Sequence, residues 1–375
     1  MVLCFLSTTI AFAAGNLWPD LSKPPKSSGE VTNVTNDSAL IVAIEDYAFV
    51  SDIPGSQQNA RDWYQWFTKT HGIPVSNIAM LENEKATKES ILKEAKRLSQ
   101  VKGEGKVWFV FIGHGAPAPD GLDGLLLGSD VQQTADSLAA RGVSQEELIS
   151  TLESNGANVI AVIDACFSGR SSDGQALVSG LQPLIATTDL NTGSSIVLSA
   201  AKHDEFAGPL PGTERPAFSY LALGALQGWG DSNNDGSVSP DEVIQYSKDT
   251  MLGVLFDRTQ TPNIRGENTD ISLSTAYDKG PDIAQIRYEL TPISKDYIKM
   301  SLASSKASML SSLLFMGIGV GIWQSAEEIQ DTDEFYKKLR VGDTIAATGI
   351  GFLFGGTVVY TGTKIMQRKN KKTKK

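Results

Sequence analysis

The sequence predicts an α/β fold in which a mainly parallel sheet is covered by helices on both faces. Three observations support this prediction. Short apolar runs with the composition of buried strands recur between residues 40 and 200, helical patterns separate them, and Gly-containing turns close several of them. Strands that alternate with helices form parallel sheets, because a parallel neighbour is reached only through a crossover connection.

Five continuous apolar runs are predicted to be strands. Runs of this length, bounded by turn residues such as Gly, Asn and Asp, are typical of strands that are buried on both faces. In chain order they are 40–44, 78–81, 106–112, 159–163 and 196–200.

Helices are predicted between and after these strands. Residues 57–70 place three aromatic side chains at helical spacing, and residues 87–100 carry one apolar stripe. A capping box, Ser144-Gln145-Glu146-Glu147, begins a helix that runs to residue 152. Helical patterns follow at 217–228 and 243–251.

Residues 1–14 are predicted to be a secretory signal peptide. An apolar stretch begins at Val2, and Ala11-Phe12-Ala13 forms a small-x-small cleavage site, although no Lys or Arg precedes the stretch. A frayed N-terminus or a misassigned start codon is the alternative. Residues 15–37 contain several Pro and Ser residues and are predicted to be a linker.

Two uncharged stretches near the C-terminus, 307–326 and 345–363, have the length needed to span a bilayer. Each contains Gly-x-x-x-Gly, which permits close helix packing. We therefore predict hydrophobic membrane-anchor helices at 307–366 and a basic tail at 367–375, with two buried helices of a soluble domain as the alternative. The basic tail favours a cytoplasmic C-terminus. An exported domain and a cytoplasmic C-terminus are compatible only if the chain crosses the membrane an odd number of times between them, whereas two helices give an even number.

The net charge of −10 conceals an asymmetry. The last twelve residues hold seven Lys or Arg and no acidic residue, so the rest of the chain carries −17. A body this acidic repels nucleic acid and favours the approach of cationic peptides. We therefore expect no nucleic-acid partner.

One of the two cysteines is a candidate for chemistry. Cys4 lies in the predicted signal peptide, which leaves Cys166 as the thiol of the mature chain. Cys166 follows the predicted strand 159–163, and His114 follows the strand 106–112, 52 residues earlier. If the two strands are neighbours, a thiol and an imidazole meet at one sheet edge and form a nucleophile–base pair. An inert, buried cysteine is the alternative.

The two strand ends also resemble a known family. Gly113-His114-Gly115 and, about 50 residues later, Asp164-Ala165-Cys166-Phe167-Ser168-Gly169 resemble the caspase-like cysteine peptidases, most closely the metacaspase and bacterial caspase-like branch. Weaker similarities lie at 53–63, 72–78 and 196–201. The resemblance covers residues 38–268, which we take as a caspase-like peptidase domain, followed by a connecting segment at 269–306.

The resemblance implies a cysteine endopeptidase that uses a dyad of Cys166 and His114 and needs no cofactor for its chemistry. It assigns the N–H groups of Gly115 and Cys166 to the oxyanion. It assigns Asp164 to the pocket for P1, the substrate residue before the cleaved bond, and implies cleavage after Arg or Lys. Ser199 ends the strand that borders the substrate groove.

One position departs from the family's pattern. A second acidic residue of the P1 pocket aligns with Asn59, which is neutral. Asp204 and Glu205 follow the strand that borders the groove, and we expect them to compensate for the missing charge. A turn-capping carboxylate is the alternative interpretation of Asp164.

Residues 231–242 match the twelve-position EF-hand loop. Alternate residues offer oxygen ligands, and Gly236 permits the sharp turn. We expect this loop to bind Ca²⁺, with an Asx-stabilised turn that needs no metal as the alternative. The expected ligands are Asp231, Asn233, Asp235, Ser237 and Glu242.

The leading hypothesis is a membrane-anchored cysteine endopeptidase with an exported, periplasmic or extracellular, domain; its partners would be a peptide or protein substrate and a membrane. An inactive caspase-fold binding module and a calcium-responsive membrane scaffold are the alternatives. Of the other histidines, His71 is expected in solvent at a helix end and His203 near the groove. Arg170 is a candidate self-cleavage point.

Overall fold

The computed structural model describes residues 17–24, 36–100, 105–168, 195–202 and 204–290, together with the single residues 306, 310, 312 and 338. One compact unit, Asn16–Arg287, contains almost all of them. The predicted signal peptide, the basic tail and, apart from those single positions, the hydrophobic stretches lie outside the described residues. Within the described part of the chain, no helix combines the length and apolar composition needed to cross a bilayer.

A six-stranded sheet forms the centre of the compact unit. Its strand order is β10-β8-β7-β3-β1-β2, and all neighbouring strands are parallel except the edge strand β10, which is antiparallel to β8. The five parallel strands are the five apolar runs of the sequence, so this prediction is confirmed. The bounds are β1 (Ser38–Ala43), β2 (Ile78–Glu82), β3 (Lys106–Ile112), β7 (Asn158–Asp164), β8 (Ile196–Ser199) and β10 (Asn263–Arg265).

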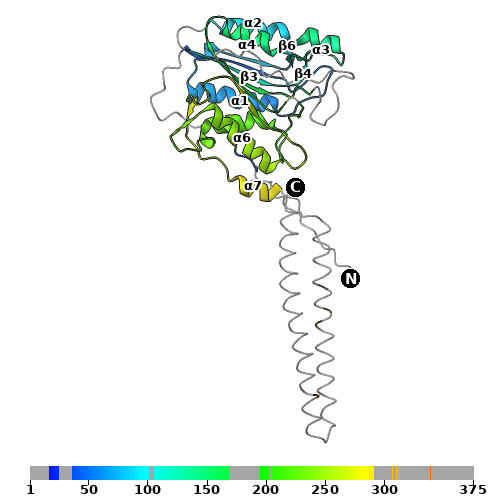
Figure 1. Ribbon diagram of the computed structural model, residues 1–375, viewed down its shortest axis with the longest axis vertical. Coiled ribbons are helices and arrows are strands. Elements are labelled where there is room, and N and C mark those ends of the chain that lie inside the picture. The colour runs from blue at the N-terminus through cyan, green and yellow to red at the C-terminus, as the bar shows by residue number, and fades with distance from the viewer. Residues whose placement is uncertain are drawn as a thin grey trace, which may run out of the picture. The chain divides into compact units, whose positions relative to one another are not determined.

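Helices cover both faces of this sheet, as predicted (Figure 1). On one face lie α2 (Lys88–Leu98) and α4 (Gln145–Glu153), which pack against each other and against β1 and β7. On the other face lie α1 (Ser56–Trp66), α5 (Ala217–Gly224) and α6 (Pro240–Val254). The helical chain continues beyond α1 to His71 and beyond α5 to Trp229.

The side chains of β3 show how the two halves of the core are filled. Successive strand residues point to opposite faces. Phe109 and Phe111 belong to the cluster that includes side chains of α2 and α4. Trp108 points the other way, and its ring centroid lies 5.8 Å from that of Trp66 and 5.5 Å from that of Phe67. The three aromatic side chains at helical spacing in 57–70, which are Trp63, Trp66 and Phe67, are therefore core residues.

A second, antiparallel sheet follows the central strand β3. It consists of β4 (Gly115–Pro117), β5 (Gly124–Leu127) and β6 (Gly142–Ser144), and α3 (Ala135–Arg141) connects the last two. No strand is predicted for this region from the sequence. Strands of three or four residues are too short for an apolar period to be recognised.

The compact unit extends beyond the 38–268 boundaries at both ends. In the expected linker, the side chains of Trp18 and Leu21 are buried, and the indole N–H of Trp18 donates to the carbonyl oxygen of Pro211 at 2.9 Å. In the expected connecting segment, Leu273 is buried and donates its N–H to Val238. This end contains β11 (Ser274–Thr275), which pairs with β9 (Ser237–Val238), and α7 (Ile283–Leu290).

Candidate active site

The backbone brings the ends of β3 and β7 into register. The two strands are direct parallel neighbours, and Ile112 pairs with Asp164. The N–H of Gly113 donates to the carbonyl oxygen of Asp164 at 3.2 Å, which extends the ladder by one step. His114 and Cys166 each follow the paired residues by two positions. The condition set by the sequence, that the two strands are neighbours, is therefore met.

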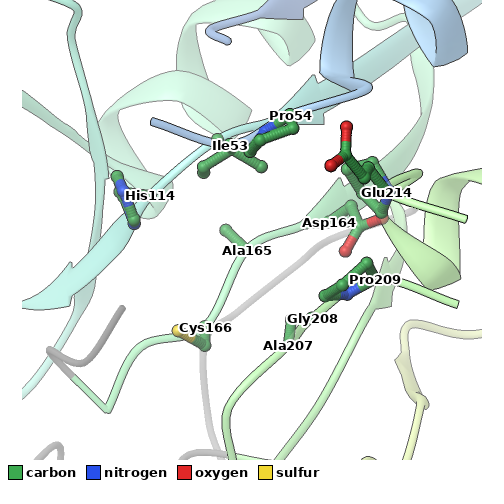
Figure 2. Close-up of a pocket in the computed structure, with 12 residues that line it drawn as sticks. Ile53, Pro54, His114, Asp164, Ala165, Cys166, Ala207, Gly208, Pro209 and Glu214 are labelled. Atoms are coloured by element: carbon green, nitrogen blue, oxygen red, sulfur yellow. The ribbon is translucent and has the colours of Figure 1, made fainter. Parts of the chain in front are cut away.

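A pocket of about 220 Å³ lies at this edge of the sheet (Figure 2). The ends of β3 and β7, the segment after β1 and residues 207–216 form its wall. Four lining residues carry groups with acid–base or nucleophilic chemistry: His114, Cys166, Asp164 and Glu214. The rest of the lining is made of Ile, Pro, Ala and Gly residues.

The imidazole of His114 is oriented by a main-chain acceptor. Its Nε2 lies 2.7 Å from the carbonyl oxygen of Ser51 and 3.4 Å from the Ser51 hydroxyl. A carbonyl oxygen only accepts hydrogen bonds, so this contact requires a proton on Nε2. The neutral ring then carries its lone pair on Nδ1, which leaves Nδ1 as the proton acceptor. This third group could not be predicted from the sequence, because the contact uses the backbone of Ser51.

Tyr47 fixes the main chain at His114. Its hydroxyl accepts the N–H of His114 at 2.8 Å and donates to the carbonyl oxygen of Leu127 at 3.3 Å. The two rings lie 4.8 Å apart. Burial raises the pKa of the Tyr47 phenol, so the hydroxyl keeps its proton for donation. Position 113 must be glycine for this approach, since a Cβ there would lie 2.7 Å from the Tyr47 oxygen.

Cys166 lies against the backbone of the His114 turn. Its residue is 5% exposed, and His114 is 3% exposed. A Cβ on Gly115 would lie 2.5 Å from the carbonyl oxygen of Cys166, so only glycine allows the two main chains this close. The resemblance assigns the oxyanion to the N–H groups of Gly115 and Cys166, and these residues are brought together here. Their role in binding an oxyanion stays a prediction.

Asp164 is a buried carboxyl group at the end of β7. Its Oδ2 accepts the N–H and the hydroxyl of Ser219, both at 2.7 Å. Burial raises the pKa of this carboxyl to about 6, although the Ser219 hydrogen bonds and the nearby Arg258 charge act in the opposite direction. The carboxyl is therefore ionised mainly above this pH, and it lines the pocket. Its role in binding P1 stays a prediction.

Asn59 lies next to this carboxyl group, and its side chain is fully used. Its amide donates to Pro216 and to the hydroxyl of Ser219, at 2.9 and 2.7 Å. Its carbonyl oxygen accepts from Nε of Arg215 at 2.6 Å. Another guanidinium nitrogen of Arg215 pairs with Asp62. Asn59 therefore anchors a neighbouring arginine and does not line the pocket.

The residues expected to compensate for Asn59 lie elsewhere. Asp204 is exposed and does not line the pocket. Glu205 accepts the N–H and the hydroxyl of Thr261 at 2.6 and 2.8 Å, so it ties two loops together. Ser199 is buried where β8 ends; it does not line the pocket, and its hydroxyl has no hydrogen-bond partner among the described residues.

Glu214 is the acidic residue that the sequence missed. It lines the pocket together with Asp164, and Figure 2 shows both carboxylates in the same part of the wall. The signal in the sequence is weak. Glu214 lies in a turn rich in Pro and Gly, where an acidic residue is most often a solvated surface group.

The loop at 231–242 forms a closed set of hydrogen bonds. The Asp231 carboxylate accepts the N–H groups of Asp235 and Gly236, and the Glu242 carboxylate accepts from the backbone and hydroxyl groups of Ser232 and Ser239. In the described part of the chain, no three His, Cys, Asp or Glu side chains are placed to hold a metal ion together. This arrangement fits the Asx-turn alternative, while calcium binding through these residues, with Asn233 and Ser237, stays a prediction.

His71 does not line the described pocket. His71 was expected in solvent, and this expectation is wrong. Its ring stacks on Trp66 at 4.9 Å, and its Nε2 lies 3.2 Å from Asp37. A helix end that turns back onto the sheet buries its last side chain. His203 and Arg170 lie outside the described residues.

Comparison with known proteins gives similarities at the level of the fold. No protein-family model matches the sequence, and no curated protein matches it. Among solved structures, caspase-1 from Spodoptera frugiperda is similar with a TM-score of 0.43 and 12% identity, over 65% of this chain and 94% of that one. The Drosophila initiator caspase Dronc is similar with a TM-score of 0.42 and 10% identity, over 65% and 89%.

A third similar structure belongs to a much longer chain. Raptor from Chaetomium thermophilum has a TM-score of 0.31 and 13% identity, over 86% of this chain and 25% of that one. At these identities, the similarities concern the fold alone.

Proposed function

We propose that this protein is a cysteine endopeptidase in which Cys166 is the nucleophile and His114 the general base and acid. The observation that carries this proposal is the shared pocket. A thiol and an imidazole enter it from two paired strand ends, and the Ser51 carbonyl holds the imidazole in the tautomer that carries its proton on Nε2 and its lone pair on Nδ1. Such a thiol and imidazole are the minimum for nucleophilic acyl transfer.

The reaction divides into two acyl transfers. A free thiol has a pKa of about 8.5, so Nδ1 of His114 takes the proton as the sulfur attacks the peptide carbonyl carbon. A C–S bond forms and the carbonyl electrons move to oxygen, where we expect the N–H groups of Gly115 and Cys166 to stabilise the charge. The C–N bond then breaks, and His114 returns its proton to the leaving amine. Water, deprotonated by His114, hydrolyses the thioester and releases the acid.

The proposed specificity is for Arg or Lys at P1. The carboxyl of Asp164 lines the same pocket as the thiol, and at neutral pH it is ionised, because its pKa is about 6. A carboxylate in a pocket whose other lining is largely apolar favours a cationic side chain. Export and membrane anchoring stay predictions of the sequence.

A panel of fluorogenic peptides that differ only at P1 tests this proposal. We expect the wild-type chain to cleave after Arg or Lys, and Cys166→Ala and His114→Ala to lose at least about 100-fold in kcat/KM. Cleavage by the Cys166→Ala protein, or a panel in which Asp at P1 is preferred, would contradict it. Glu267→Gln, an exposed carboxylate beyond β10 at the opposite end of the sheet, is the matched control.

A caspase-fold binding module without activity is the second candidate. The observation that favours it is the small exposure of the two dyad residues, 3% for His114 and 5% for Cys166. Labelling with a peptidyl electrophile at neutral pH separates the two functions. A peptidase is labelled at Cys166, whereas a module with an inert thiol is not.

A further inference from the structure

The turn that carries Glu214 has a defined backbone. Pro209 and Pro216 form a bridge across it, and the N–H of Leu210 donates to the carbonyl oxygen of Arg215 at 2.9 Å. Gly212 adopts a φ of 82°, which permits the reversal of the chain. The turn therefore places Glu214 at a fixed position of the pocket wall.

The main chain at Glu214 is also held from the other side. A Cβ on Gly55 would lie 3.0 Å from the carbonyl oxygen of Glu214 and 2.9 Å from Cα of Arg215. Gly55 has a φ of 82° and immediately precedes α1. The turn is thus packed against the N-terminus of the helix that carries Asn59.

The neighbouring arginine leaves Glu214 without a counter-charge. Arg215 directs its guanidinium to Asn59 and Asp62. In the described part of the chain, no Lys, Arg or His side chain forms an ion pair with Glu214. The carboxylate of Glu214 is therefore available to a cation that enters from outside.

The charges that line the pocket have one sign. Asp164 and Glu214 are its two carboxylates, and no described Lys or Arg lines it. Arg258 stands behind the wall, where it donates to the carbonyl oxygen of Pro209 at 2.7 Å and is 4% exposed. A Cβ on Gly208 would lie 3.0 Å from its guanidinium carbon, so Gly208 separates Arg258 from the pocket.

From this arrangement we propose that Glu214 is a specificity-determining residue, and that it acts with Asp164 to bind the guanidinium or ammonium group of a P1 Arg or Lys. It takes the place of the charge that Asn59 lacks. P1 is defined only for a cleaved substrate, so the proposal rests on the proposed peptidase function. The interaction itself is the binding of a cationic side chain between two carboxylates.

Binding to a protein that cannot turn over tests this inference apart from catalysis. In the Cys166→Ala background, the dissociation constants of two matched peptides are measured by calorimetry, one with Arg and one with norleucine at P1. We expect Glu214→Gln to weaken binding of the Arg peptide about fivefold and to leave the norleucine peptide unchanged. Glu267→Gln should change neither peptide, and Tm values establish that all variants fold.

Three results would overturn the inference: an unchanged constant for the Arg peptide in Glu214→Gln, an equal loss for both peptides, or no measurable binding of either. The peptidase proposal is tested separately, by measuring peptide cleavage by the wild-type protein. A protein that binds the Arg peptide through Glu214 and cleaves nothing would refute the peptidase function and leave the cation pocket standing.

Discussion

His114 is held by contacts that begin in the segment after β1. The Ser51 carbonyl fixes the ring through Nε2, and the Tyr47 hydroxyl fixes the main chain through the His114 N–H. A base that is oriented by its surroundings loses little entropy when the thiol proton is transferred. In the proposed peptidase, the segment at 47–51 would therefore position His114 although it carries no reacting atom.

Replacing Tyr47 by Phe should impair catalysis with little effect on the fold. The change leaves the buried N–H of His114 without its acceptor, at a cost of about 1–3 kcal/mol. We expect kcat to fall about tenfold with KM unchanged, because the imidazole moves relative to the thiol. Steady-state kinetics measure this, and Tyr64→Phe, at a half-buried position on α1, is the control. A kcat equal to that of the wild type would show that Tyr47 has no positioning role.

The pKa of Asp164 makes stability depend on pH. The carboxyl has an ordinary pKa of 3.8 when unfolded and about 6 when folded, so the folded state binds its proton more tightly. The resulting stabilisation is complete below pH 3.8 and is lost as the pH rises through 6. Asp164→Asn keeps an acceptor for Ser219. The difference in free energy of unfolding between this variant and the wild type should shift in favour of the variant by up to about 3 kcal/mol between pH 3.5 and pH 8.

Urea unfolding of both proteins at the two pH values measures this difference. The other carboxylate that lines the pocket, Glu214, is exposed and is present in both proteins, so its own titration does not distinguish them. An equal stability gap at both pH values would contradict a raised pKa at Asp164. A wild-type kcat/KM for Arg peptides that rises through pH 6, while the Asn variant shows no such rise, would link the same ionisation to substrate binding.

At the scale of elements, the loop before α6 begins the helix with its own side chains. Ser239 and Glu242 form a reciprocal capping box at its N-terminus. We expect Ser239→Ala to lower the free energy of unfolding by about 1 kcal/mol. If the loop is only an Asx-stabilised turn, added Ca²⁺ should leave the Tm unchanged, whereas a loop that binds Ca²⁺ should show a higher Tm.

Thermal unfolding with Ca²⁺, with Mg²⁺ and with a chelator decides whether the loop binds metal. A rise in Tm that is specific for calcium, and that Asp231→Asn abolishes, would support the ligand set expected from the EF-hand spacing. Asp249→Asn, an exposed carboxylate further along α6, is the control.

At the scale of the whole compact unit, residues 17–24 pack against the turn that carries Glu214. Trp18 bonds to Pro211, and the Tyr220 hydroxyl donates to the carbonyl oxygen of Pro19 at 2.6 Å. Trp18→Ala should cost about 3 kcal/mol because the side chain is buried. It should also raise KM for Arg peptides. Denaturant unfolding and kinetics measure both effects, with the exposed Lys23→Ala as control; unchanged values would show that this segment only rests on the surface.

The sequence predicted the parts of this unit that depend on long, uniform signals. Each strand of the parallel sheet is a continuous apolar run, and two of these runs end in short motifs that contain His114 and Cys166. Such features are local, so a single sequence is enough to reveal them.

The missed features depend on distant partners. Glu214 reaches the pocket only because its turn packs on Gly55, 159 positions earlier in the chain. Tyr47 accepts a bond from a residue 67 positions away. Neither contact has a periodic signature, and the burial of Trp18 depends equally on tertiary packing. Propensity and periodicity describe neighbours along the chain and do not encode such encounters.

The acceptor that orients His114 is a carbonyl oxygen of the main chain. Every amino acid supplies this atom, so the identity of residue 51 can change while the orientation of the His114 ring is retained. A search for an invariant third catalytic side chain among homologues would consequently find nothing at this position. Only changes to the path of the backbone, such as an insertion or deletion between residues 47 and 54, would move the oxygen.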